Sequence, residues 1–180
     1  MKDTDQETLM RYALELARKA IAEGELPIAA VLTSGTTILC EAHNRVATTK
    51  YLTAHAENLL FDGARDLLAP MGLAERSGLT LYSTLEPCVM CCGATMTHNI
   101  GTVCYALESP GDGVLSILHA WEKKSEQLPF YRVPQIIGGV LRAESATLFR
   151  DFAQRHPNSR FAKWARQLYN LIAKTPFMLL

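Results

Sequence analysis

Two short segments of the sequence contain side chains that could bind a metal ion and activate a water molecule. His55 and Glu57 are two positions apart in the first segment, and Cys88 and Cys91 are three positions apart in the second. On a helix, residues three apart face the same side, and a helix N-terminus favours a thiolate over a thiol. Two thiolates and one neutral imidazole are three tetrahedral ligands for zinc and balance its charge, which leaves the fourth position for water. The spacing therefore predicts one catalytic zinc ion per chain, held by His55, Cys88 and Cys91.

Glu57 has a different predicted role, because it follows a metal ligand closely without being one. A carboxylate in that position can take a proton from water and return it to a ring nitrogen or a leaving amine. His55-Ala56-Glu57 and the later Pro87-Cys88-Val89-Met90-Cys91 match the H-x-E and P-C-x-x-C signature of zinc-dependent deaminases. The reaction that this signature implies is hydrolytic: a ring C–NH2 group becomes C=O, and ammonia leaves.

The C-x-x-C pair alone also has a structural interpretation, as half of a closed zinc site or as two buried thiols. Cys92 is the obvious fourth ligand for a closed site, but it is rotated by roughly 100° around the helix from Cys91. It cannot easily reach the same ion. Because His55 and Glu57 are also placed at a predicted helix start, we favour the catalytic site.

The segments around these residues predict alternating helices and strands. Apolar residues at helical spacing predict helices over residues 4–23, 53–68, 87–98, 114–121, 143–155 and 159–172. Short apolar runs predict strands over residues 27–32, 37–42, 79–84, 102–106 and 135–141, the first two as a hairpin. Strands interleaved with helices indicate an α/β sandwich. We expect a deaminase domain over residues 1–158 and a helical extension over 159–180, packed on the same domain or on a partner subunit.

Composition excludes several classes of protein. Of the 180 residues, 48% are hydrophobic, and 18 basic side chains balance 18 acidic ones, so no net charge attracts a polyanion. No apolar run approaches the roughly 20 residues that cross a bilayer. Five cysteines are an odd number, and three of them lie within five positions, which suits metal ligation better than a set of disulfides. We therefore expect a cytoplasmic protein that does not bind membranes.

Across residues 8–155 the sequence resembles the cytidine and deoxycytidylate deaminase superfamily, and within it the branch of bacterial tRNA adenosine deaminases and guanine deaminases. The matching segments are 26–32, 43–46, 53–57, 81–91 and 93–94. The resemblance implies a three-layer α/β/α sandwich with a central five-stranded mixed sheet, zinc held at two helix starts, and a homodimer.

The same resemblance implies contacts with the substrate. The side chain of Asn44 and the backbone of Ala56 would orient a base, and the backbone at Pro87 would lie near the reacting centre. Phe149 or Phe152 would close the pocket.

Some residues depart from the branch in ways that bear on the substrate. Tyr51-Leu52 stands where both groups of enzymes usually have Asp-Pro, and Glu108-Ser109-Pro110 stands where the tRNA enzymes tend to have an aspartate. Residues 142–174 carry seven basic side chains against two acidic ones, which suits either an RNA-binding surface or the solvent-facing side of an amphipathic helix. We favour the second interpretation.

The sequence thus predicts a zinc-dependent hydrolytic deaminase of a small purine or pyrimidine base or nucleoside. The alternative is a tRNA-specific adenosine deaminase, with RNA as a possible but less favoured partner. A catalytically silent zinc-binding module is the third hypothesis.

Overall fold

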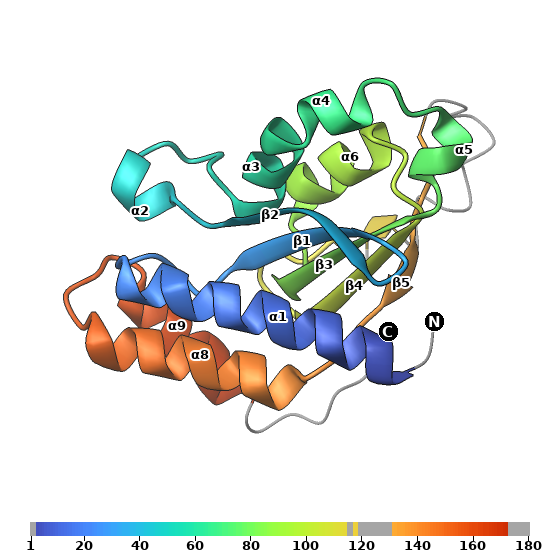
Figure 1. The fold of residues 1–180 in the computed structure, drawn as a ribbon. Coiled ribbons are helices and arrows are strands. Elements are labelled where there is room, and N and C mark those ends of the chain that lie inside the picture. The colour runs from blue at the N-terminus through green and yellow to red at the C-terminus, as the bar shows by residue number, and fades with distance from the viewer. Residues whose placement is uncertain (1–2, 115–116, 119–130, 173–180) are drawn as a thin grey trace.

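A five-stranded mixed sheet forms the centre of the computed structural model, which describes residues 3–114, 117–118 and 131–172 (Figure 1). The strands are β1 (Ala29–Ser34), β2 (Thr37–His43), β3 (Leu79–Leu85), β4 (Thr102–Leu107) and β5 (Gln135–Ile137). They lie in the order β2-β1-β3-β4-β5. Strand β1 pairs antiparallel with both β2 and β3, whereas β3, β4 and β5 are parallel. The predicted α/β class and five-stranded mixed sheet are confirmed.

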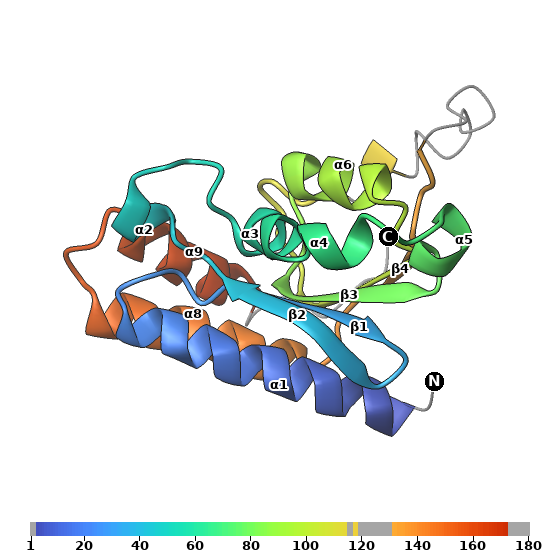
Figure 2. The same ribbon diagram turned by 45° about the horizontal axis from the view of Figure 1, so that its top comes forward.

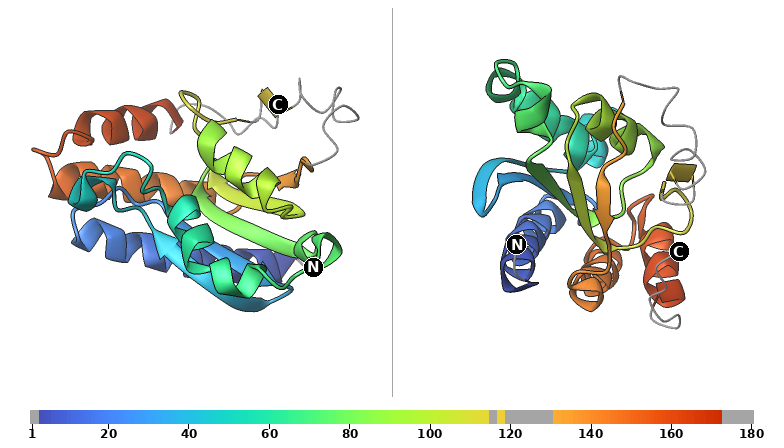
Figure 3. Two further views of the ribbon diagram at one scale, coloured as in Figure 1. Left: turned by 90° about the horizontal axis from the view of Figure 1, so that it is seen from above. Right: turned by 90° about the vertical axis from the view of Figure 1, so that its right-hand side faces the viewer.

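Helices cover both faces of this sheet and complete the three layers. One face carries α1 (Asp3–Ala22), α8 (Arg142–Arg155) and α9 (Ala162–Ile172), which lie in a row (Figure 3). The other face carries α3 (Ala56–Gly63), α4 (Arg65–Leu68) and α6 (Val89–Thr97) (Figure 2). Two short helices, α2 (Val46–Thr49) and α5 (Leu73–Arg76), lie in the connections. No helix in the described ranges is both long and apolar enough to cross a membrane.

The core explains why these segments fold as they do. Strand β1 is buried from Ala29 to Thr33, which is expected of a strand covered on both faces. Helix α1 buries Met10, Leu14 and Ala17 at helical spacing, and its chain turns at Gly24 with φ of +80°. The predicted first helix and the β1–β2 hairpin are confirmed by this arrangement.

Two of the predicted helices begin later than expected, and the delay places metal-binding candidates just before each helix. Helix α3 begins at Ala56 because His55 has extended backbone angles (φ −73°, ψ 152°). Helix α6 begins at Val89 because Cys88 is also extended (φ −74°, ψ 173°), so Pro87 lies outside the helix rather than in its first turn. The predicted helix over 53–68 is also divided, since Ala64 leaves helical geometry (φ −86°, ψ 5°) between α3 and α4.

The last predicted strand is shorter than expected. Strand β5 ends at Ile137, and two residues later Gly139 turns the chain with φ of +83°. Position 138 packs against the Tyr105 ring so closely that a Cβ atom there would lie 2.4 Å from it, which leaves room only for glycine. The last predicted helix begins at Ala162, three residues later than expected. Of the predicted helix over 114–121, residues 117–118 are helical, and residues 115–116 and 119–121 lie outside the described part of the chain.

Candidate metal centre and pocket

His55, Cys88 and Cys91 form a compact group of potential metal ligands. His55 Nδ1 lies 3.7 Å from Cys88 Sγ and 3.5 Å from Cys91 Sγ, and the two sulfur atoms are 3.6 Å apart. A tetrahedral zinc ion, with bonds of about 2.3 Å to sulfur and about 2.0–2.1 Å to nitrogen, separates its ligand atoms by about 3.5–3.8 Å. The three side chains therefore fit one zinc ion. They are the one group of this kind among the described residues.

Two helix N-termini position these ligands. His55 is the residue before α3, Cys88 is the residue before α6, and Cys91 lies in the first turn of α6. Strand β3 ends at Leu85, three residues before Cys88, so the central sheet fixes the position of that ligand. The positive end of the α6 dipole favours negative charge at this position.

The pKa values of the two cysteine thiols are shifted in opposite directions. Hydrogen bonding with Cys91, followed by that with His55, lowers the pKa of Cys88 to about 4. The contact with Cys88 raises the pKa of His55, and the contact with Cys88 together with burial raises the pKa of Cys91. Without metal, the two hydrogen-bonded cysteines therefore share a proton. A metal ion must displace that proton to bind both sulfur atoms.

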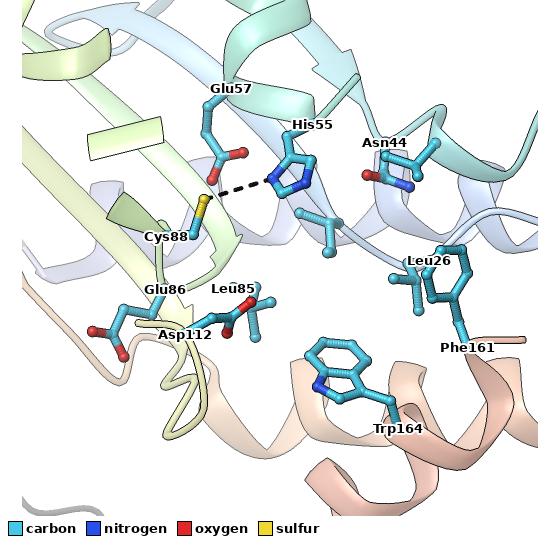
Figure 4. Close-up of a pocket in the computed structure, with 12 residues that line it drawn as sticks. Leu26, Asn44, His55, Glu57, Leu85, Glu86, Cys88, Asp112, Phe161 and Trp164 are labelled. Carbon is cyan, nitrogen blue, oxygen red and sulfur yellow. Dashed lines mark hydrogen bonds between the residues drawn. The ribbon is translucent and has the colours of Figure 1, made fainter. Parts of the chain in front are cut away.

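Glu57 lies beside this group in the first turn of α3. Its side chain is almost fully buried and extends toward Cys88 (Figure 4). Ser83 of β3 donates a hydrogen bond of 3.1 Å to Glu57 Oε1. Burial raises the pKa of the Glu57 carboxyl, which makes the group a better proton acceptor than a solvated glutamate. This geometry suits a group that transfers protons next to the metal.

Cys92 lies away from the metal-binding group. It is buried in a small apolar cluster with Met96, Val114 and Leu118. The structure therefore agrees with the argument that its position on the helix excludes it as a ligand.

A pocket of about 370 Å³ opens beside the candidate metal centre. His55, Glu57 and Cys88 form one end of it, and Asn44 faces it from the segment after β2 (Figure 4). Apolar side chains line much of the remaining wall: Leu26, Ile28, Val46 and Leu85. A mostly apolar pocket with a few polar groups is typical of small-molecule sites.

The aromatic wall of the pocket differs from the expectation. Phe149 and Phe152 are fully buried in the core and do not line the pocket. Phe161, directly before α9, and Trp164, in the first turn of α9, line it instead. Trp164 also makes an edge-to-face contact with Phe149, with ring centroids 5.8 Å apart, so the core residue supports the wall.

Two acidic residues in the pocket wall were not predicted. Glu86 accepts a hydrogen bond of 2.9 Å from Ser109 N–H, and a Cβ atom at Gly113 would lie 2.3 Å from the Glu86 carboxyl carbon. Asp112, which accepts a hydrogen bond from Ser109 Oγ, belongs to the same turn. The position of Glu86 directly before Pro87 is a sequence signal that could have identified it, whereas the turn that carries Asp112 offers no comparable signal.

Of the three residues expected to contact the substrate, one side chain lines the pocket and two do not. Asn44 faces the pocket, while Ala56 and Pro87 are buried at the helix starts and their side chains do not line it. Glu108 stands where the tRNA enzymes tend to have an aspartate. It forms an ion pair with Arg142 at the start of α8, and Arg142 Nε lies 2.9 and 2.8 Å from its two carboxylate oxygens. Glu108 thus ties α8 to the end of β4.

Comparisons with known proteins agree with the fold and the metal site. Residues 3–107 match the family model described as the cytidine and deoxycytidylate deaminase zinc-binding region. The tRNA-specific adenosine deaminase of Bacillus subtilis is 34% identical over 149 residues, which are 83% of this chain and 89% of that protein.

Two kinds of solved structure are also similar. A structure from a study of tRNA:A34 deaminases has a TM-score of 0.64 and 31% identity, covering 77% of this chain and 96% of that one. The guanine deaminase of Nitrosomonas europaea has a TM-score of 0.67 and 26% identity, covering 81% of this chain and 83% of that one. The chain therefore belongs to the cytidine and deoxycytidylate deaminase family, and it is a zinc-dependent hydrolase that acts on the carbon–nitrogen bond of a cyclic amidine.

Proposed function

We propose that this deaminase acts on a small purine or pyrimidine base or nucleoside, held in the pocket beside the metal centre. The observation that carries the proposal is the aromatic wall, because Phe161 and Trp164 line the pocket on the side away from His55 (Figure 4). A flat heteroaromatic ring can stack on such a wall at a centroid distance of about 4.5–7 Å. The pocket volume of about 370 Å³ is at the lower end of the range of roughly 300–1,000 Å³ for small-molecule sites.

In this proposal, three residues of the metal centre bind zinc and a fourth transfers protons. His55, Cys88 and Cys91 hold zinc, which when bound lowers the pKa of a coordinated water to about 7. Glu57 takes a proton from the attacking water and delivers protons to the substrate ring nitrogen and the leaving amine. One water is consumed, the ring C–NH2 becomes C=O, and ammonia leaves, so the atoms balance.

Three further residues orient the substrate in this proposal. The Asn44 side chain bonds to an edge of the base, the backbone of Ala56 contributes a second hydrogen bond, and the backbone at Pro87 lies near the reacting carbon. Their places at the pocket and at the two helix starts support these roles. The acidic Asp112 adds an acceptor on the side of the pocket away from Asn44 (Figure 4).

Deamination of adenosine within tRNA is the second candidate, favoured by the 34% identity to the Bacillus subtilis enzyme over 83% of this chain. On α9 and just before it, Arg160, Lys163 and Arg166 are exposed and could contact phosphates. The same spacing is typical of the solvent side of an amphipathic helix, and the opposite side of α9 buries Ala165 and Leu168. The net charge of zero supplies no general attraction to RNA. We therefore rank the small substrate first.

We also propose a homodimer that works in the cytoplasm, with a domain over 1–158 and an extension over 159–180. Exposed apolar side chains at Tyr51, Leu52 and Val89, near the two helix starts, support a protein contact. The packing of α9 on α8 supports an extension that belongs to the same domain. Light scattering of the purified full-length chain tests the dimer, and a monomer at micromolar concentration would contradict it.

Ammonia release over a panel of free substrates tests the proposed function. Zinc-loaded protein is incubated with guanine, adenosine, cytosine and related bases and nucleosides, and Glu57→Gln protein purified in parallel reports contaminating activity. We expect at least one substrate to give ammonia and the carbonyl product in equal amounts. Inertness of the whole panel would contradict the small-substrate proposal.

A further inference from the structure

Glu25 is a fully buried carboxylate next to the pocket that the catalytic scheme above does not use. It lies in the segment between α1 and β1, and it accepts three hydrogen bonds. Its Oε2 accepts 2.9 Å bonds from Asn44 Nδ2 and from the Ala47 backbone N–H, and its Oε1 accepts a 2.6 Å bond from the Thr48 backbone N–H. One carboxylate thus holds a pocket side chain and the first turn of α2 together.

These contacts determine which end of the Asn44 amide enters the pocket. A carboxylate accepts hydrogen bonds and donates none, so only the Nδ2 end of Asn44 can face Glu25. The Oδ1 atom is then directed the other way, toward the side on which His55 lies (Figure 4). Asn44 is itself 2% exposed, and its backbone N–H donates to Ile28 O at 2.8 Å, which leaves the side chain little freedom.

We infer that Glu25 is a positioning residue that fixes the Asn44 amide with its oxygen toward the substrate. This inference rests on the proposed function, because it assumes that Asn44 contacts the base. It has a consequence for the substrate: the edge that meets Asn44 presents a hydrogen-bond donor, a ring N–H, an amine or a hydroxyl. A substrate with only acceptors on that edge would leave Asn44 Oδ1 buried without a partner and would bind about tenfold or more weakly.

Two single substitutions disturb this arrangement in opposite ways. Glu25→Gln keeps the size of the side chain but replaces one acceptor oxygen by an NH2 donor, which in either orientation meets a backbone N–H, that of Ala47 or that of Thr48. Asn44→Asp keeps an acceptor toward the pocket but places a second carboxylate about 3 Å from Glu25, where like charges repel strongly. We expect each variant to lose about 100-fold in kcat/KM, since a small misplacement of an orienting group has effects of that order.

The double variant Glu25→Gln/Asn44→Asp separates positioning from a merely structural role. In it, the amide at position 25 can donate to the carboxylate at position 44, whose second oxygen still faces the pocket. We expect kcat/KM to recover at least tenfold over Asn44→Asp alone. A structural contribution of Glu25 to α2 predicts the opposite result, a loss equal to the product of the two single losses.

Two control variants distinguish a loss of positioning from a loss of folding. Glu23→Gln changes an exposed glutamate of the same turn and should leave kcat/KM within twofold of the unmodified protein. Glu25→Asp keeps the charge but withdraws it by one methylene, and we expect an intermediate loss that remains measurable if Glu25→Gln does not fold. Circular dichroism and zinc content are measured for every variant.

All variants are assayed with whichever substrate the unmodified protein deaminates, free base, nucleoside or tRNA anticodon stem-loop. Inertness of the unmodified protein toward every free substrate would contradict the proposed function and would move the same comparison to the stem-loop. Unchanged kcat/KM in folded Glu25→Gln, or multiplicative losses in the double variant, would overturn the positioning role.

Discussion

The buried hydroxyl of Ser83 donates a hydrogen bond of 3.1 Å to Glu57 Oε1, which links the central strand β3 to the proposed proton-transfer group. Ser83→Ala removes this bond and so weakens the positioning of the Glu57 carboxylate. A hydrogen bond to a charged group contributes about 1.5–3 kcal/mol, so we expect kcat to fall by about tenfold or more. Steady-state kinetics at saturating substrate measures the change.

Ser145→Ala is the matched control for this prediction. Ser145 is also fully buried, and it donates a hydrogen bond of 2.6 Å to Thr84 O, away from Glu57. Its loss should lower the free energy of unfolding by about 1 kcal/mol and leave kcat unchanged. Equal kinetic effects of the two serine substitutions would mean that the Ser83 bond acts through general stability.

Glu57→Gln separates metal binding from chemistry. Because Glu57 is a proposed proton carrier and not a ligand, the variant should bind one zinc ion per chain and lose about 10²- to 10⁴-fold in turnover. Metal analysis and ammonia release are measured on the same preparation. A catalytically silent zinc module would have no turnover to lose, and loss of the metal in this variant would show that Glu57 is a ligand.

Cys88→Ala and Cys91→Ala should each lose zinc, whereas Cys92→Ala should retain it. The first two remove sulfur atoms that lie 3.6 Å apart and within 3.7 Å of His55 Nδ1, and the third removes a thiol from a separate apolar cluster. Metal analysis after dialysis measures the difference. Retention of zinc in both of the first variants would contradict the assignment of the site.

Zinc binding should also strengthen as the pH rises through the acidic and neutral range. The pKa values of Cys91 and His55 are raised above their ordinary values in the metal-free protein, so each group holds its proton to a higher pH than usual and the metal must displace that proton. Since a proton released on binding opposes binding at low pH, the apparent zinc affinity should fall as the solution is acidified. Titration with a zinc indicator at several pH values, together with proton release in unbuffered solution, tests this. Affinity independent of pH would contradict it.

Trp164→Ala should remove most of the aromatic wall of the pocket. We expect KM for a free base to rise about tenfold while kcat changes less, because stacking holds the ring without taking part in proton transfer. Tyr169→Ala is the control: it also removes an aromatic ring from α9, one that packs under Arg150 with the guanidinium carbon 5.6 Å from the ring centroid and does not line the pocket. Equal effects on KM would mean that only the stability of α9 matters.

The candidate zinc ligands could be predicted from the sequence because each of the two segments carries its own local signal. Cys88 and Cys91 are three positions apart at a helix start, which brings them to one side, and His55 and Glu57 match the H-x-E part of a known signature. The apolar periods of α1 and β1 are local in the same way, so the layers of the sandwich could be predicted too. The exact first residues of α3 and α6 could not be predicted, because the extended backbone angles of His55 and Cys88 depend on the fold around them.

The rest of the pocket depends on contacts between segments far apart in the sequence. Trp164 shows only the period of an amphipathic helix, and its place opposite His55 follows from how α9 packs on α8. Glu25 is separated from Asn44 by strands β1 and β2, and no spacing rule connects the two. In the sequence, Ser83 has only the pattern of a strand residue, and its bond to Glu57 depends on the tertiary packing.

The measurement that tests the small-substrate claim most directly compares two substrates at two salt concentrations. Values of kcat/KM are determined for the best free base or nucleoside and for an adenosine-containing tRNA anticodon stem-loop, at about 50 and 200 mM salt. We predict the larger value for the free substrate and little change with salt, because its binding neutralises no phosphates. The contradicting result is inertness toward every free base and nucleoside, conversion of the stem-loop adenosine to inosine, and activity that falls by about 0.7 log unit per log unit of salt for each phosphate contacted.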